Sequence, residues 1–536
     1  MTHRDKMQAF AGVLLVLFLA SLNTTVVGTA LPRIIADLGG MNVYTWAFTA
    51  YTLAQTVSIP VYGKLSDLYG RKPVLLFGIA LFTLASALGG LSQSMGFLIA
   101  CRALQGLGGG ALMSMAFAAI GDLFTLTERG KYQGLNGAVF GVSSVLGPLL
   151  GGFLTDHLSW HWVFFVNVPV AVLAFWFIAR FFPAKRERGE ARIDVLGALL
   201  LTAAVVPLLL ALTWGGTTDP WTSPKILGLL AFAAACTAAF VTWQARTPSP
   251  ILALNLFRNP TFTFANIAGF FSTAGLYAAI LYLPLFMQGV RGVSASNSGI
   301  VLAPLMLGMI VTSTVAGFIV SRVGRYKPAI LAGLVVMTGA LFFGTRLTPD
   351  TATSVVVGLM IVLGLGLGPT GSLFTLAVQT SSPRAQLGMA TSANQFFRNM
   401  GGTIGAAVFG AVQANHLHAL PTLLASSTRA LPSSLAVAVA DPNILSNPSA
   451  LAKLHAAVAP LVGEAGFARI LATMRGVLTD AVTNVFLLAG LGMTVALLVT
   501  LALPNLNLKS VRPQPETPRA PEVEAKPLAG VGVRER

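Results

Sequence analysis

The sequence predicts an all-α membrane protein with fourteen membrane-spanning helices. Its 536 residues are 55% hydrophobic and only 10% charged, whereas soluble domains carry about 25% charged residues. Apolar stretches of roughly 20 residues recur along the whole chain, and each is long enough to cross the hydrocarbon core of a bilayer as a helix. The lipid bilayer is therefore the expected surroundings of this chain.

The expected spans follow one another in chain order. They are 10–30, 44–62, 74–92, 97–120, 134–154, 162–182, 195–213, 226–243, 262–286, 297–320, 328–346, 354–378, 391–413 and 480–503. The first has no small-residue cleavage signal and is expected to stay as a helix. Residues 414–479 are rich in Ala, Ser and Pro and predict an external loop with some amphipathic helix. Residues 509–536 are rich in Pro and charge and predict a disordered cytoplasmic tail.

Lysine and arginine are distributed unevenly over the predicted turns. If the N-terminus is cytoplasmic, most of the 34 bases fall on the cytoplasmic side, as the positive-inside rule requires. This predicts that both termini are cytoplasmic. The net charge of +16 then reflects orientation in the membrane, and no nucleic-acid partner is expected. Cys101 and Cys236 fall in apolar segments, and the six histidines form no ligand pattern, so we expect no metal and no cofactor.

An internal repeat divides the chain. Residues 317–325 resemble residues 63–71, with Ser321 in the place of Asp67. This offset predicts two six-helix halves, 1–182 and 262–508, related by an axis along the membrane normal. Residues 183–261 then contribute two additional helices outside the twelve-helix core.

Residues 62–73 form a charged turn between two apolar segments. The pattern is G-x-L-x-D-x-x-G-R-K, and it resembles the loop between the second and third helices of the major facilitator superfamily. Asp67 and Arg71 lie four residues apart, and Asp122 is a plausible third member. The resemblance implies a charge latch that forms in one conformation and breaks in the other. The alternative is a static loop salt bridge, which is worth little at a wet surface.

Arg102 opens the run Arg-Ala-Leu-Gln-Gly-Leu-Gly-Gly-Gly inside an apolar segment. An arginine at this depth is costly unless it faces a wet cavity or a partner. The run resembles the fourth-helix motif of the superfamily, where the arginine is linked to proton movement. The alternative is an arginine that snorkels to the outer surface.

Small residues repeat along the predicted fifth helix. Their spacing lets helices approach closely, and the proline adds a bend. The run resembles the antiporter motif, which separates exporters from importers in the superfamily. Its members are Gly137, Gly141, Gly147, Pro148, Gly151 and Gly152.

Three further runs narrow the resemblance. Residues 22–32, 160–169 and 283–292 are similar to motifs of the fourteen-helix drug:proton antiporters, a multidrug efflux family. This resemblance spans roughly residues 10–503. It implies export of amphipathic, often cationic compounds in exchange for protons, by a monomer in the cytoplasmic (inner) membrane of a bacterium.

Asn23 departs from the pattern of that family, which usually has an aspartate here. A carboxylate could bind and release a proton, whereas an amide cannot. None of the other acidic residues is expected in the middle of a helix. Either another acid takes over the coupling, or the chain is a natural uncoupled variant, or the residue has been changed to hold one conformation.

Polar and aromatic side chains in the predicted helices are candidates for substrate binding. Their alternative role is interhelical hydrogen bonding that holds the bundle together. The candidates are Asn23, Tyr51, Gln55, Tyr277, Tyr282, Asn394 and Arg398.

The sequence therefore predicts a secondary exporter of amphipathic compounds, coupled to protons and working by alternating access. A second hypothesis is an exporter or flippase of a lipid or other endogenous amphiphile with weak or absent proton coupling, because a cavity without acids favours neutral or zwitterionic cargo. A nucleotide-driven pump or a membrane enzyme is not expected, since the chain has no phosphate-binding G-x-x-x-x-G-K-[ST] run.

Overall fold

A computed structural model gives the arrangement of most of the chain. It describes residues 2–39, 43, 46–184, 193–216, 218–293, 298–417, 419–425, 431–439, 441, 444–445 and 448–509. Regular structure in these ranges is helical, so the predicted all-α class is confirmed. The predicted tail lies outside the described residues apart from Lys509.

The first half of the chain forms one bundle. Its helices are α1 (His3–Leu38), α2 (Trp46–Tyr69), α3 (Arg71–Gly89), α4 (Met95–Leu123), α5 (Leu126–His157), α6 (Trp162–Phe165) and α7 (Asn167–Phe181). Gly70 separates α2 from α3 with a φ of 88°, a conformation that glycine adopts without the steric cost a side chain would add. A capping box of Thr125 and Glu128 starts α5, which satisfies amide groups that have no partner within the helix.

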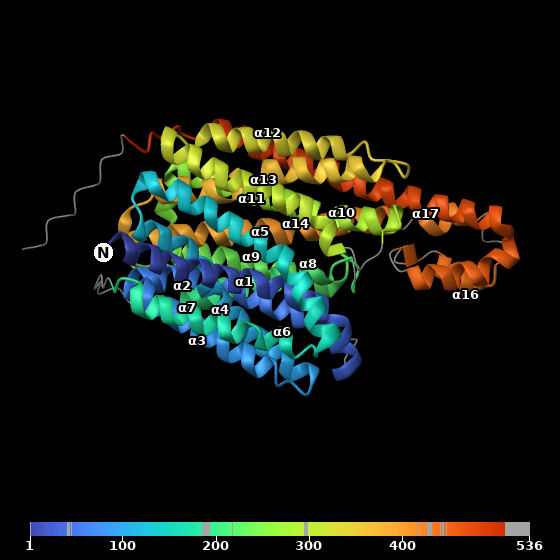
Figure 1. The fold of residues 1–536 in the computed structure, drawn as a ribbon, viewed down its shortest axis with the longest axis horizontal. Coiled ribbons are helices and arrows are strands. Elements are labelled where there is room, and N and C mark those ends of the chain that lie inside the picture. Colours follow the sequence, from blue (N-terminus) through green and yellow to red (C-terminus); the bar gives the residue numbers. More distant parts are fainter. Residues whose placement is uncertain are drawn as a thin grey trace, which may run out of the picture.

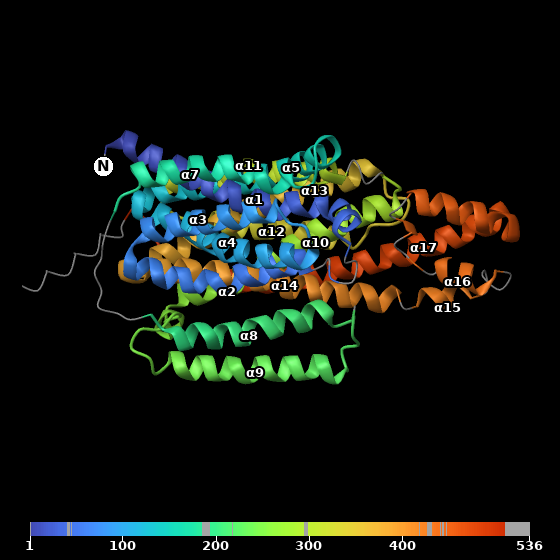
Figure 2. The same cartoon turned by 90° about the horizontal axis from the view of Figure 1, so that it is seen from below.

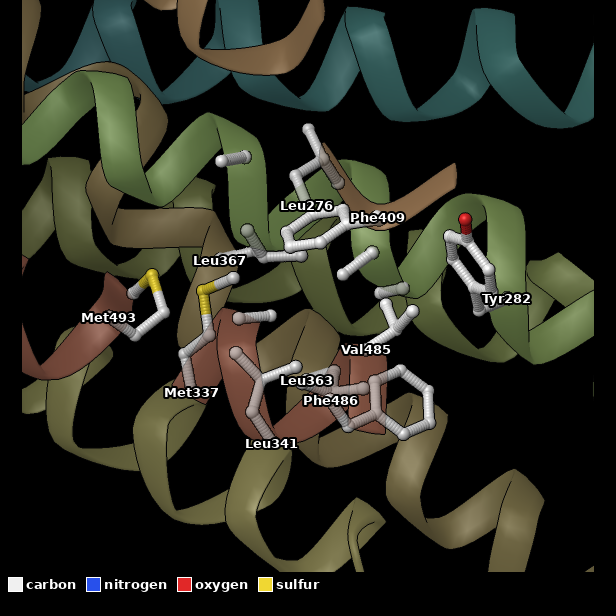
Figure 3. Close-up of a cluster of buried hydrophobic side chains, with 14 of the residues drawn as sticks. Leu276, Tyr282, Met337, Leu341, Leu363, Leu367, Phe409, Val485, Phe486 and Met493 are labelled. Carbon is white, nitrogen blue, oxygen red and sulfur yellow. The ribbon is translucent and has the colours of Figure 1, made fainter. Parts of the chain in front are cut away.

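The second half forms a bundle beside the first (Figure 1). Its long helices are α10 (Pro260–Leu285), α11 (Ser298–Val323), α12 (Lys327–Gly344), α13 (Thr353–Ser381), α14 (Leu387–Leu417) and α17 (Pro448–Leu501). The π-helical turn η2 (Phe286–Val290) extends α10, and the short η1 (Leu254–Arg258) and η4 (Arg384–Gln386) precede α10 and α14. Apolar side chains from all six of these long helices pack into one cluster. Figure 3 shows part of it, including Met337, Leu363 and Phe486.

Two helices lie outside both bundles. Figure 2 shows α8 (Val195–Trp214) and α9 (Pro224–Gln244) as a separate pair beside the core. Asp194 joins the two, because its carboxylate accepts hydrogen bonds from Trp243 Nε1 at 2.9 Å and Gln244 Nε2 at 2.7 Å. The pair contacts the core through an edge-on contact between Trp214 and Trp46 of α2. The division of the chain into 1–182, 183–261 and 262–508 stays a prediction.

Twelve helices among the described residues are long and apolar enough to cross a membrane, with α6 and α7 counted as one. Two more, α2 with 24 residues and α14 with 31, have membrane length but are more polar. These two helices meet each other across the two halves, where Asp67 of α2 accepts hydrogen bonds from two amides of α14.

The region predicted as an external loop contains more helix than expected. Beyond α14 come α15 (Leu420–Leu424) and α16 (Ser433–Val439), and α17 begins at Pro448, well before the predicted span. Gly463 interrupts α17 with a φ of 76°. Figure 1 shows α16 and the first part of α17 projecting beyond the rest of the molecule, at the end opposite the N-terminus.

Candidate functional site

A cavity lies between the two halves. Its volume is about 190 Å³, and four helices of each half line it: α1, α2, α4 and α5 from the first, and α10, α11, α13 and α14 from the second. No described residue of α8 or α9 borders it. A site shared equally by two bundles changes shape whenever the bundles move against each other.

Three of the predicted substrate-binding residues line this cavity: Gln55, Tyr277 and Arg398. Arg398 Nη1 donates to the carbonyl of Gly371 at 2.7 Å, and Arg398 Nε donates to Thr273 Oγ1 at 3.4 Å. Gln55 and Tyr277 come from opposite halves, α2 and α10, so polar groups face the cavity from both sides.

The other four predicted substrate-binding residues do not line it. Tyr282 is 4% exposed and packs in the apolar cluster of the second half, with its ring edge-on to Phe409 (Figure 3). Asn394 is fully buried, where it accepts a hydrogen bond from Thr375 at 3.0 Å and donates one to Asn266 at 3.1 Å. Asn394 thus makes hydrogen bonds between helices, whereas Tyr282 contributes apolar packing.

Asn23 and Tyr51, the remaining two, surround Arg102. The Arg102 side chain is fully buried, so it does not snorkel to the surface. Its Nε donates to the carbonyl of Ala47 at 2.9 Å, and its Nη1 donates to Asn23 Oδ1 at 3.3 Å and to Gln105 Oε1. The guanidinium carbon lies 4.3 Å from the centre of the Tyr51 ring, within the range of a cation–π contact.

A chain of hydrogen bonds continues from this arginine. Gln105 Nε2 donates to Ser86 Oγ at 3.0 Å, and Asn167 Nδ2 donates to the same oxygen at 3.1 Å. Helices α1, α2, α3, α4 and α7 are thereby tied together. No acidic residue belongs to this network as far as the described residues show, and two donors in it, Arg102 Nη2 and Asn23 Nδ2, are buried without a hydrogen-bond partner.

The turn motif lies at the end of the bundle that also holds the first turn of α1, which we call the charged end. Arg71 Nη1 is 2.7 Å from Asp67 Oδ1, and Arg71 Nε is 3.0 Å from Asp122 Oδ2. The structure thus brings together all three residues that the sequence proposed as a latch. Asp67 is 6% exposed, so this ion pair is largely withdrawn from water.

The latch extends to the other half of the molecule. Asp67 Oδ1 accepts from the backbone N–H of Gly388 at 2.9 Å, and its Oδ2 accepts from that of Met389 at 2.8 Å. These amides open α14, where unpaired N–H groups and the helix dipole favour an anion. A carboxylate of α2 is therefore bound to the start of a helix from the second half, a contact that we call the Asp67 clamp.

Sequence reasoning missed other residues at this end. Gln133 of α5 donates to Gln379 of α13 at 3.2 Å, which adds a second polar link between the halves. Arg129 is buried and donates to the carbonyls of Phe124 and Gly121 at the end of α4. Gln133 could have been noticed as a glutamine beside a long apolar segment, but nothing in the sequence indicated that Gln379 is its partner.

The glycines of the antiporter motif contact two different helices. A Cβ at Gly137 or Gly141 would overlap Ser313 or Ile310 of α11, in the second half. At Gly147 and Gly151 it would overlap residues of α1, whereas at Gly152 it would meet nothing within 4 Å. Gly152 is therefore a member of the motif without a close neighbour, and Pro148 stands inside α5.

Two adjacent glycines offer a matched test of this packing. A Cβ at Gly151 would come within 2.7 Å of the Val26 carbonyl oxygen. We expect Gly151→Ala to lower the stability of the purified protein by about 1–3 kcal/mol, the usual cost of overpacking. Gly152→Ala should leave the melting temperature unchanged or raise it, because alanine favours helix over glycine. Equal melting temperatures for the two variants would contradict the assignment.

Comparisons with known proteins agree with this architecture. Residues 13–406 match the family model described as Major Facilitator Superfamily. The chain is 45% identical over 401 residues to the multidrug transporter protein MdtP of Bacillus subtilis. This match covers 75% of this chain and 74% of that protein. It is 39% identical over 404 residues to multidrug resistance protein 3 of the same organism, covering 75% and 79%.

A solved structure has the same fold. The human organic anion transporter MFSD10 superposes with a TM-score of 0.59 over 91% of this chain and 99% of that one, at 15% identity. At this identity the likeness concerns the fold alone. Taken with the family match and the two relatives, it establishes that the chain belongs to the major facilitator superfamily.

Proposed function

We propose that this protein exports amphipathic compounds by alternating access, in exchange for protons. Membership of the superfamily makes the chain a multi-pass membrane transporter rather than an enzyme. Export is supported by two relatives that are named for multidrug transport or resistance. The observation that carries the proposal is the cavity that four helices of each half share.

The transport cycle that we propose depends on contacts between the two halves at the charged end. The Asp67 clamp and the Gln133–Gln379 link join the two halves at the charged end, and we take this form as the one closed at that end. We place this end in the cytoplasm of a bacterium, since the bases of the turns gather there. Breaking the clamp lets the halves rock apart and admits a compound from the cytoplasm or inner leaflet. Reforming the clamp commits the cycle to release on the far side. One chain contains both halves, so a monomer suffices.

A second candidate is an exporter of a lipid or other endogenous amphiphile with weak proton coupling. It is favoured by the absence of acidic side chains among the described residues that line the cavity and those that surround Arg102. Because Asn23 stands in place of a carboxylate, neither the described lining of the cavity nor the surroundings of Arg102 contain an acidic group that could bind a proton on one side of the membrane and release it on the other.

Dye efflux from intact cells separates the two candidates. Cells that express the chain are loaded with a lipophilic fluorescent dye, and efflux is followed with and without a protonophore at equal expression. Proton antiport predicts that the protonophore abolishes efflux, and the weakly coupled exporter predicts that efflux persists. Efflux no faster than in cells that lack the chain, for every dye tried, would contradict both.

A further inference from the structure

The charge of the central cavity points to the chemical class of its substrate. We propose that the compound exported by this protein is an amphiphile with one negatively charged oxyanion group, such as a carboxylate, sulfonate or phosphate monoester, and that Arg398 binds this group. The inference rests on the proposed export function and adds to it the charge that the substrate carries.

Arg398 is the one side chain with a formal charge at neutral pH among the described residues that line the cavity. Hydroxyl, amide and apolar side chains make up the rest of that lining. A single uncompensated cation in a site of low dielectric constant attracts anions and repels cations, and the effect is larger there than in water. A cationic drug would therefore meet a like charge here and no carboxylate.

The guanidinium is held in position by neutral partners. Its Nη1 and Nε donate to the Gly371 carbonyl and the Thr273 hydroxyl, so α13 and α10 fix its direction from two sides. Among the described residues it has no ion pair and no hydrogen bond from Nη2. A fixed guanidinium with a free N–H edge suits an oxyanion, because arginine presents its donors in a rigid planar fork.

Arg102 does not offer the same opportunity. Like Arg398, it is a cation without an acidic partner among the described residues. Unlike Arg398, it is fully buried and does not border the cavity. Tyr51 and the carbonyl of Ala47 enclose it. Of the two membrane-embedded arginines, only Arg398 is within reach of a compound in the cavity.

The surroundings of Arg398 also provide for an apolar body. Phe48, Phe117, Phe140 and Leu276 line the same cavity. A second hollow of about 260 Å³ lies between α8 and α14, and Thr403 borders both spaces. Thr403 is five residues beyond Arg398 on α14, which is roughly 7.5 Å along the helix axis. An anionic head at Arg398 would thus leave an apolar tail directed along α14 toward this hollow.

Two dyes with the same aromatic body test the inference. Anilinonaphthalene sulfonate carries one sulfonate, whereas N-phenylnaphthylamine is neutral. Binding of each to the purified full-length protein in nanodiscs is measured by fluorescence, with empty nanodiscs subtracted. The variants are Arg398→Gln, Arg398→Lys and, as a matched loss of one charge away from the cavity, Arg322→Gln at the exposed end of α11.

We expect Arg398→Gln to weaken binding of the sulfonate about tenfold or more, the usual effect of losing a hydrogen bond to a charged group. Binding of the neutral dye should not change, which also shows that the variant is folded. Arg398→Lys should recover part of the sulfonate affinity, and Arg322→Gln should behave as the wild type.

Equal losses for the two dyes in Arg398→Gln would overturn the inference, because Arg398 would then hold helices together rather than bind an anion. Unchanged sulfonate affinity would overturn it as well. Neither result touches the export proposal, which fails instead if the wild type shows no efflux of any dye from cells.

Discussion

Replacing Asn23 with aspartate is expected to increase the dependence of efflux on the proton gradient. Asn23 Oδ1 accepts a hydrogen bond from Arg102 Nη1, while Asn23 Nδ2 and Arg102 Nη2 are buried without partners. A carboxylate replaces the unpartnered donor with an acceptor and supplies the arginine with a counter-charge, and such charge-assisted pairs are about twice as strong as neutral ones. It also introduces a group that can take up and release a proton within the membrane.

The measurement is dye efflux at equal expression, with and without a protonophore. We expect the protonophore-sensitive part of efflux to be larger in Asn23→Asp than in the wild type, where another acidic residue would have to carry the coupling. Asn23→Ser, which also lacks a carboxylate, should resemble the wild type. Full protonophore sensitivity in the wild type, with nothing added by the aspartate, would place the coupling acid elsewhere, and Asp122 would be the first residue to examine.

Replacing Asp67 with alanine is expected to slow transport about tenfold or more without unfolding the protein. Its carboxylate pairs with Arg71 and accepts two N–H groups at the start of α14. Removing one partner of a buried ion pair typically costs roughly 3–5 kcal/mol, and every 1.4 kcal/mol is about a tenfold change in an equilibrium. Because α14 belongs to the other half, this cost falls on the form closed at the charged end. The cycle should then stall in the open form.

The control for this variant is Asp156→Ala, which removes an exposed carboxylate near the opposite end of α5. It should transport at the wild-type rate. The measurement is the initial efflux rate of each variant and of the wild type, corrected for the amount of protein in the membrane. A wild-type rate in Asp67→Ala would show that the ion pair is only a static feature of the loop.

The sequence was sufficient for features that depend on composition and local spacing. Apolar length located the helices, and the i, i+4 spacing of Asp67 and Arg71 anticipated their contact. The cost of an arginine in an apolar segment predicted a cavity or a partner for Arg102, and hydrogen bonds to Ala47, Asn23 and Gln105 supply the partners. In each case the physical cause lies within one helix or one turn, so it can be read from neighbouring residues.

Features that depend on how helices are rotated against one another were not accessible in this way. Tyr277 and Tyr282 are five residues apart on α10, yet one lines the cavity and the other packs in the core of the second half. Asn394 and Arg398 differ likewise on α14. The amide partners of Asp67 could not be found either, because a backbone N–H carries no mark in the sequence.

The most direct test of alternating access is a distance between the two halves at the charged end. Spin labels at Tyr69, at the end of α2, and Ala385, just before α14, report it in a protein whose Cys101 and Cys236 are replaced by alanine. We predict two distances, a short one that corresponds to the closed form and a longer one that corresponds to the open form. The fraction of molecules with the longer distance should increase when an exported dye is added and in Asp67→Ala. A single short distance that neither change alters, in a protein that exports dye, would contradict the account.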